Sequence, residues 1–133
     1  MQNILNRPAK TLSQAQRLGY FRDGFIGVER LVSQEWLDKL NAVTNEFVEI
    51  SRNLRSKDRR FDLEPDHSPT LPRIRRLNSP VDYHETFWEF ASQGPFVDVA
   101  EDLLGPDVKF HHSKLNFKWG GGGEEVKWHQ DIQ

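Results

Sequence analysis

The sequence predicts an α+β chain that is mostly helical over residues 11–105 and forms strands over residues 106–133. Over much of the first region, apolar residues recur every three or four positions, as on one face of a helix. After Gly105-Pro106 the apolar residues alternate with polar ones, as in a strand. The 133 residues, 36% of them hydrophobic, fit one globular domain with a buried core.

The chain opens with residues 1–10, which we expect to form a loose arm. Thr11 or Ser13 can cap a helix that ends near Arg22. The run at 25–28 is expected to be a short strand, because Asp23-Gly24 breaks the helix before it. The positions expected to face inward on this first helix are Leu12, Ala15, Leu18 and Phe21 or its neighbour Tyr20.

The clearest helix follows Ser33, a good N-terminal cap. It carries an apolar stripe that predicts packing against a sheet. The stripe consists of Trp36, Leu40, Val43, Phe47, Ile50 and Leu54. Residues 55–80 are expected to be a loop, since prolines and charged side chains replace the apolar pattern there.

Two more helices are expected, one over residues 83–91 and one that begins at Pro95 and stops at Gly105-Pro106. A long strand over residues 108–119 should follow. Its apolar residues change parity near His112-Ser113, which predicts either a bulge or a sheet buried on both faces.

Composition argues against several function classes. The formal charge of −2 gives no general attraction to nucleic acid or membranes, and no stretch is long and apolar enough to be a signal or a membrane span. We therefore expect no nucleic-acid or membrane partner. The absence of cysteine fits a reducing compartment, so we expect a cytoplasmic protein. The basic cluster over residues 52–76 is offset by acidic residues and is expected to be solvated. An alternative stays open, in which an arginine within residues 73–76 faces an anionic ligand.

The closing stretch holds the best candidate for a chemical site. A loop of four glycines, 120–123, separates two expected strands, and the second carries His129 and Asp131. Side chains two residues apart on a strand point the same way, so this pair can converge on a metal. Nitrogen and oxygen ligands suit iron(II), and one more histidine would complete a facial triad.

Two other patterns are weaker. The glycine loop lacks the Gly-Lys-Ser/Thr run of a phosphate loop, and we expect it to be a flexible hairpin loop. His111 and His112 are neighbours on an expected strand and should face opposite sides, so we do not expect them to bind one metal.

The order of these motifs resembles the phytanoyl-CoA dioxygenase family, and the resemblance extends from about Leu18 to Gln133. The stretches that carry it are Tyr20–Ile26, Phe87-Trp88, Leu103–Val108, Ser113–Lys118, the glycine loop and Val126–Asp131.

This resemblance implies a double-stranded β-helix, jelly-roll or cupin-like, with helices packed outside. It implies an iron(II)- and 2-oxoglutarate-dependent dioxygenase that uses dioxygen to hydroxylate an unactivated carbon of a small-molecule substrate. His129 and Asp131 match iron ligands, with Gln130 between them beside the cofactor. Lys114 and Arg76 match positions that line the 2-oxoglutarate pocket.

In the family, a distal histidine and an arginine follow the His-x-Asp motif, whereas this sequence stops at Gln133. We therefore expect a single partial domain, the N-terminal half of the β-helix, that is inactive by itself. The alternative is a non-catalytic module that binds another chain, or a second copy of itself, through exposed sheet edges. The sequence leaves the substrate and the oligomeric state open.

Overall fold

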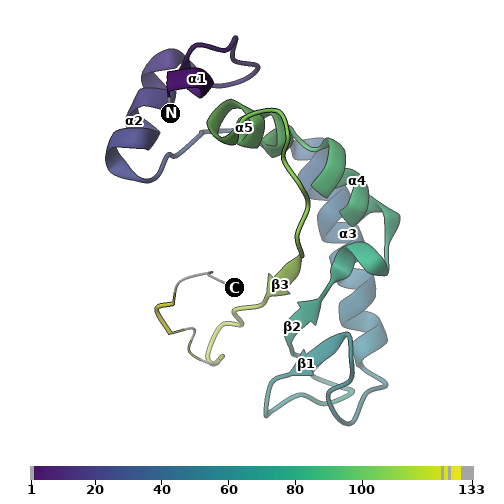
Figure 1. The fold of residues 1–133 in the computed structure, drawn as a ribbon. Helices are drawn as coiled ribbons and strands as arrows, with labels where there is room; N and C mark the ends of the chain where they lie inside the picture. Colours follow the sequence, from purple (N-terminus) through teal and green to yellow (C-terminus); the bar gives the residue numbers. More distant parts are fainter. Residues whose placement is uncertain (1, 124, 126, 130–133) are drawn as a thin grey trace.

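The computed structural model describes residues 2–123, 125 and 127–129 and combines helices with one small sheet (Figure 1). The helices are α1 (Gln2–Leu5), α2 (Gln14–Asp23), α3 (Gln34–Ser51), η1 (a 3-10 turn, Pro80–Asp82), α4 (Glu85–Gln93) and α5 (Pro95–Leu104). The strands are β1 (Phe61–Leu63), β2 (Ile74–Asn78) and β3 (Lys114–Asn116). This mixture of helix and antiparallel sheet agrees with the α+β prediction.

The sheet is antiparallel throughout and has the order β1-β2-β3. Phe61 pairs with Leu77, and Leu77 pairs in turn with Leu115. A register shift between Asp62 and Leu63 marks a bulge on this edge. Directly paired residues of an antiparallel sheet share a face, so one face is apolar and the other is polar.

The apolar face forms the core together with α3 and α4, which lie along one side of the sheet in Figure 1. Phe47 of α3 contacts the rings of Phe61 and Phe87, with centroids 6.1 and 6.0 Å apart. The residues of this core are Val43, Phe47, Phe61, Ile74, Leu77 and Phe87. The sheet-packing role predicted for the stripe on α3 is thus confirmed at its centre.

Helix ends largely match the sequence signals. Ser33 caps α3 by accepting a hydrogen bond from the backbone N–H of Trp36 at 3.3 Å. Helix α5 begins at Pro95, and Gly105 follows its last residue with a φ of 104°, a backbone conformation that glycine adopts readily.

The N-terminal region differs from the expectation. The arm over residues 1–10 contains α1 and is held to α5, because the backbone N–H groups of Lys10, Thr11 and Leu12 each donate to Asp102 at 2.8 Å. Ser13, not Thr11, caps α2.

The inward face predicted for the first helix is right at Leu12, which is buried just before α2, but wrong at Ala15 and Leu18, which are exposed. Leu18 is 51% exposed, whereas Arg17 is buried and donates from Nε to the carbonyl oxygen of Asp102 at 3.0 Å. Its other guanidinium nitrogens donate to the carbonyls of Arg7 and Ile4. A fully hydrogen-bonded arginine takes the place that periodicity assigned to leucine.

Three expected segments need correction. The expected loop over residues 55–80 contains β1 and β2, which are central to the core. The run at 25–28 forms no strand, and Phe25 is 74% exposed. The expected strand over 108–119 is reduced to β3. The chain joins the sheet only near Ser113, whose carbonyl accepts a hydrogen bond from the backbone N–H of Ser79 at 3.1 Å. The change of parity near His112-Ser113 is therefore the start of the strand and not a bulge.

Candidate functional site

The face of the sheet that lies opposite the core carries a row of polar side chains across all three strands. Arg76 on β2 is at its centre. Its Nη1 lies 3.2 Å from Oδ2 of Asp62 on β1, and its Nε donates to Oδ1 of Asn116 on β3, also at 3.2 Å. The guanidinium is therefore held in one orientation between a carboxylate and an amide.

Lys114 lies on the same face as Arg76. It pairs with Asn78, two residues along β2 from Arg76, and it is exposed. The two cations predicted to face 2-oxoglutarate thus sit diagonally on neighbouring strands, a separation that long side chains can bridge toward one ligand.

His129 is exposed, and its Nδ1 lies 2.7 Å from the carbonyl oxygen of Lys127. A carbonyl accepts only, so Nδ1 carries the proton and a metal would take Nε2, the ring nitrogen with the lone pair in that tautomer. Gln130 and Asp131 lie outside the described residues. The second strand expected here is not seen in residues 125 and 127–129.

The donor types in His-x-Asp fit a divalent iron ion, since imidazole and carboxylate are its usual protein ligands in facial sites. Within the part of the chain that the structure describes, no three histidine, cysteine, aspartate or glutamate residues gather closely enough to hold a metal. That search does not include Asp131. The described site therefore supplies one of the two proposed ligands.

The segment between β3 and His129 folds back along β2. The backbone N–H of Phe117 donates to the carbonyl of Arg75 at 3.0 Å, and the indole Nε1 of Trp119 donates to the carbonyl of Ile74 at 2.7 Å. The glycine loop then passes close to Arg73, whose Nη1 would lie 3.3 Å from a Cβ placed on Gly122. A side chain there would displace the tip of Arg73 by a few tenths of an ångström, whereas Gly121 and Gly123 have φ values of 77° and 110°, which glycine adopts readily.

A larger, mainly apolar groove of about 710 Å³ lies between α4, α5 and the segment over residues 108–115. Phe110 closes part of it by an edge contact with Trp88, at 5.6 Å between ring centroids. His111 and His112 lie on its rim and are exposed, with their Nδ1 atoms 2.5 Å apart. They precede β3, so the strand geometry expected to separate them does not apply.

Sequence reasoning missed Asp62 and Asn116, the two partners of Arg76. Asn116 could have been found, because it has the same strand parity as Lys114. Asp62 could not, since it lies in a segment that was assigned to a loop.

No helix among the described residues combines the length and the apolar character that crossing a membrane would require.

The phytanoyl-CoA dioxygenase family model matches residues 20–133 of this chain. The chain is 26% identical over 116 residues to a probable alpha-ketoglutarate-dependent hypophosphite dioxygenase of Stutzerimonas stutzeri, a match that covers 87% of this chain and 40% of that protein. It is 29% identical over 125 residues to an ectoine dioxygenase of Sphingopyxis alaskensis, covering 92% of this chain and 38% of the relative.

An ectoine dioxygenase of Streptomyces avermitilis is 26% identical over 125 residues, with 92% of this chain and 39% of the relative covered. No solved structure matches. The chain thus spans about two fifths of the length of these relatives. Because the family model covers residues 20–133, most of the sequence, this chain belongs to the phytanoyl-CoA dioxygenase family.

Proposed function

We propose that this chain forms the first part of an iron(II)- and 2-oxoglutarate-dependent dioxygenase that hydroxylates an unactivated carbon of a small-molecule substrate. The observation that carries the proposal is the shared face of Arg76 and Lys114, reached through the β2–β3 register. Family membership and the names of the relatives, which are dioxygenases, support the class of reaction.

The two cations have different tasks in this proposal. Arg76 is already fixed by Asp62 and Asn116, so it presents a preset guanidinium to a carboxylate of 2-oxoglutarate. Lys114 is exposed, and it supplies a point charge to the same dianion. A small dicarboxylate between them would meet the charge of Lys114 and the guanidinium of Arg76, whose own charge Asp62 already offsets in part.

His129 and Asp131 are proposed as two ligands of the iron, with Gln130, which lies between them in the sequence, beside the cofactor. The contact of His129 Nδ1 with the Lys127 carbonyl orients the ring so that Nε2 is presented to the metal. When bound, iron(II) with 2-oxoglutarate and dioxygen supplies the oxidising chemistry, in which the co-substrate loses carbon dioxide and one oxygen atom enters the substrate. The protein residues named here bind and orient.

The β-helix itself belongs to this proposal. Strands β1 to β3 would be its first core strands, and the polar face would line its interior, while α3 and α4 cover the outside. With two protein ligands in place of three, iron should be held weakly, so we expect residues 1–133 expressed alone to show no turnover.

The binding step can be tested by thermal melting of protein made from the complete reading frame, in the presence of iron(II) and 2-oxoglutarate without dioxygen. A ligand that binds only the folded state raises the melting temperature. We expect the rise caused by 2-oxoglutarate to disappear in Arg76→Gln and to persist in Arg59→Gln, a matched change at an exposed arginine outside the sheet. An equal rise in both variants would refute the role of Arg76.

A second candidate function, a non-catalytic module that self-associates, rests on the sheet edges. Among the described residues, β1 and β3 each pair only with β2, so each has an outer edge that can accept another strand. This candidate predicts a dimer, which light scattering would detect. It also predicts that iron and 2-oxoglutarate do not change the melting temperature.

A further inference from the structure

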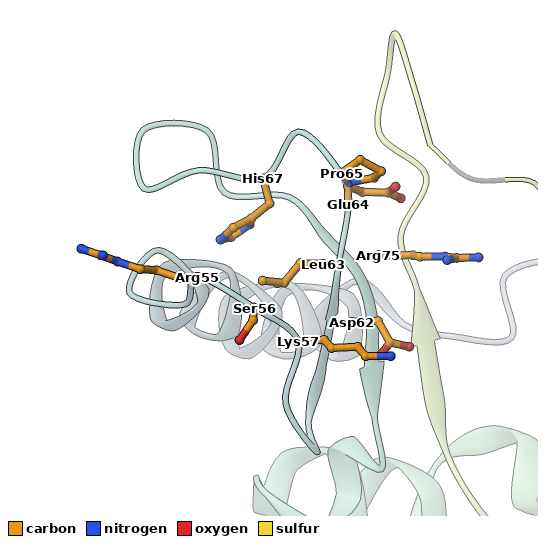
Figure 2. Close-up of a pocket in the computed structure, with 9 residues that line it drawn as sticks. All are labelled: Arg55, Ser56, Lys57, Asp62, Leu63, Glu64, Pro65, His67 and Arg75. Atoms are coloured by element: carbon orange, nitrogen blue, oxygen red, sulfur yellow. The ribbon is translucent and has the colours of Figure 1, made fainter.

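A second, polar pocket adjoins the candidate site, with which it shares Asp62. It is an open pocket of about 390 Å³, lined by the segment after α3, by β1 with the loop that follows, and by β2 (Figure 2). Its lining residues are Arg55, Ser56, Lys57, Asp62, Leu63, Glu64, Pro65, His67 and Arg75. Apart from Asp62, which holds Arg76, these residues have no task in the proposed dioxygenase chemistry.

His67 contributes a hydrogen-bond donor to this pocket. Its Nδ1 accepts a hydrogen bond from the backbone N–H of Arg73 at 2.9 Å, so in the neutral ring the proton must reside on Nε2. That Nε2 is buried and has no hydrogen-bond partner among the described residues. A buried N–H without an acceptor is costly, and such a group is a common sign of a missing ligand or water.

The charges around the pocket favour an anion. Arg55 and Lys57 form no ion pair within the described residues, and both are exposed. Of the two carboxylates, Asp62 is bound to Arg76, which compensates its charge. The carboxylate of Glu64 points away from His67 in Figure 2, toward the segment after β3, in agreement with its Oε1 lying 3.9 Å from a Cβ placed on Gly123.

We propose that this pocket binds a phosphate group, with His67 Nε2–H as its fixed donor and with the exposed Arg55 and Lys57 as the cations that reach it. Arg75 is not one of these donors, because its side chain points away from His67 in Figure 2. Two cationic side chains and a neutral N–H donor suit an anion of charge near two with several acceptor oxygens. The volume leaves room beside the phosphate for part of an ester. The group can come from free phosphate, from a soluble phosphomonoester or from a lipid headgroup, because all three present the same oxygens.

The test measures binding of inorganic phosphate to the 133-residue chain by calorimetry, at constant ionic strength set with chloride. We expect Arg55→Gln and His67→Asn each to weaken binding about tenfold or more, which is the loss of one charge-assisted hydrogen bond. Asparagine keeps an oxygen where Nδ1 accepts from Arg73, so His67→Asn removes the donor and retains the loop contact. Arg55 is exposed, and its substitution leaves the core intact.

Two control variants match these changes in chemistry. Lys39→Gln removes a cation from the exposed side of α3, outside the pocket. His84→Asn removes an imidazole whose Nδ1 also accepts a backbone N–H, that of Thr86 at 3.1 Å. Both should bind phosphate as the unaltered chain does. Equal weakening in the controls, no phosphate binding at all, or displacement of phosphate by 2-oxoglutarate would each overturn the proposal.

The source of the phosphate is separated by two further probes. Glycerol phosphate that binds more tightly than inorganic phosphate, with the same loss in Arg55→Gln, supports a soluble ester. Sedimentation with vesicles that contain phosphatidic acid, lost in the same variant, supports a lipid headgroup. Neither measurement involves iron or turnover, so its outcome is independent of the proposed dioxygenase activity.

Discussion

Asp102 and Glu64 are buried to nearly the same extent, with 4% and 5% of their surface exposed, but their surroundings differ. Both oxygens of Asp102 accept backbone N–H groups, whereas Oε1 of Glu64 has no hydrogen-bond partner among the described residues. His67 and Arg73, whose backbones are both hydrogen-bonded to that of Glu64, each also have a buried nitrogen without a partner among the described residues. We conclude that a buried carboxylate whose oxygens all accept hydrogen bonds stabilises the fold. A cluster of buried polar groups without hydrogen-bond partners instead marks a candidate site for a ligand.

The largest effect is expected from Asp102→Asn, which should lower the free energy of unfolding by about 3 kcal/mol. The amide is isosteric, but whichever way it turns, its NH2 group faces a backbone N–H that the carboxylate had accepted. Urea unfolding measures the loss. Asp98→Asn, on the same helix and paired with Lys10 at the surface, should change little, and an equal loss in both would contradict the anchoring role of Asp102.

The pH dependence of stability tests the same anchor. Burial by itself would raise the pKa of Asp102, but the three backbone N–H groups and the charge of Arg17 outweigh it, and the pKa is lowered below 3.8. The stabilising contribution is therefore complete above that ordinary value and is lost as the pH falls through the lowered pKa. Urea unfolding at several pH values below 5 should show a fall in stability that is smaller in Asp102→Asn. Identical pH profiles would contradict this assignment.

Trp119→Phe should cost about 1 kcal/mol of folding free energy, the usual contribution of one hydrogen bond. The change removes the donor to the Ile74 carbonyl and retains an aromatic ring to stack on Phe117, whose centroid lies 5.8 Å away. Amide hydrogen exchange in β2 should increase at the same time. No change in exchange would indicate that the segment before the glycine loop is not held by this contact.

The smallest effect is expected from Glu64→Gln, within about 0.5 kcal/mol of the unaltered chain or slightly more stable, because it removes a buried charge that accepts no hydrogen bond at Oε1. Like Asp102→Asn, this substitution replaces a carboxylate by the amide of the same shape. A difference in stability between the two variants therefore reports the surroundings of each side chain. A loss as large as that of Asp102→Asn would show that Glu64 is also a structural anchor.

Much of the helical layer could be predicted from the sequence, because its signals are local. Ser33 before the stripe on α3, and Pro95 and Gly105 at the ends of α5, each act through the backbone of their own helix. The strands β1 and β2 could not be found in this way. Ile74 and Leu77 are both buried but three residues apart, since the bulge opposite Asp62 breaks the alternation on which strand prediction depends.

For the candidate site, the sequence predicted Arg76 and Lys114, and the structure places them on one face of neighbouring strands. Their role with 2-oxoglutarate and the iron ligands His129 and Asp131 remain predictions. The partners of Arg76 could not be foreseen, because Asp62 and Asn116 come together with it only through pairing between distant segments. Tertiary hydrogen bonding likewise decided the burial of Arg17, which no periodicity predicts.

The most direct measurement of the proposed function is the iron(II)-dependent conversion of 2-oxoglutarate to succinate by protein made from the complete reading frame. Succinate formed under dioxygen is compared between the unaltered protein, His129→Ala and the control His84→Asn. We predict that His129→Ala lowers turnover about 100-fold or more, since it removes a metal ligand, and that the control retains it. Turnover that survives in His129→Ala, or that does not require added iron(II), would contradict the assignment of this motif to the metal.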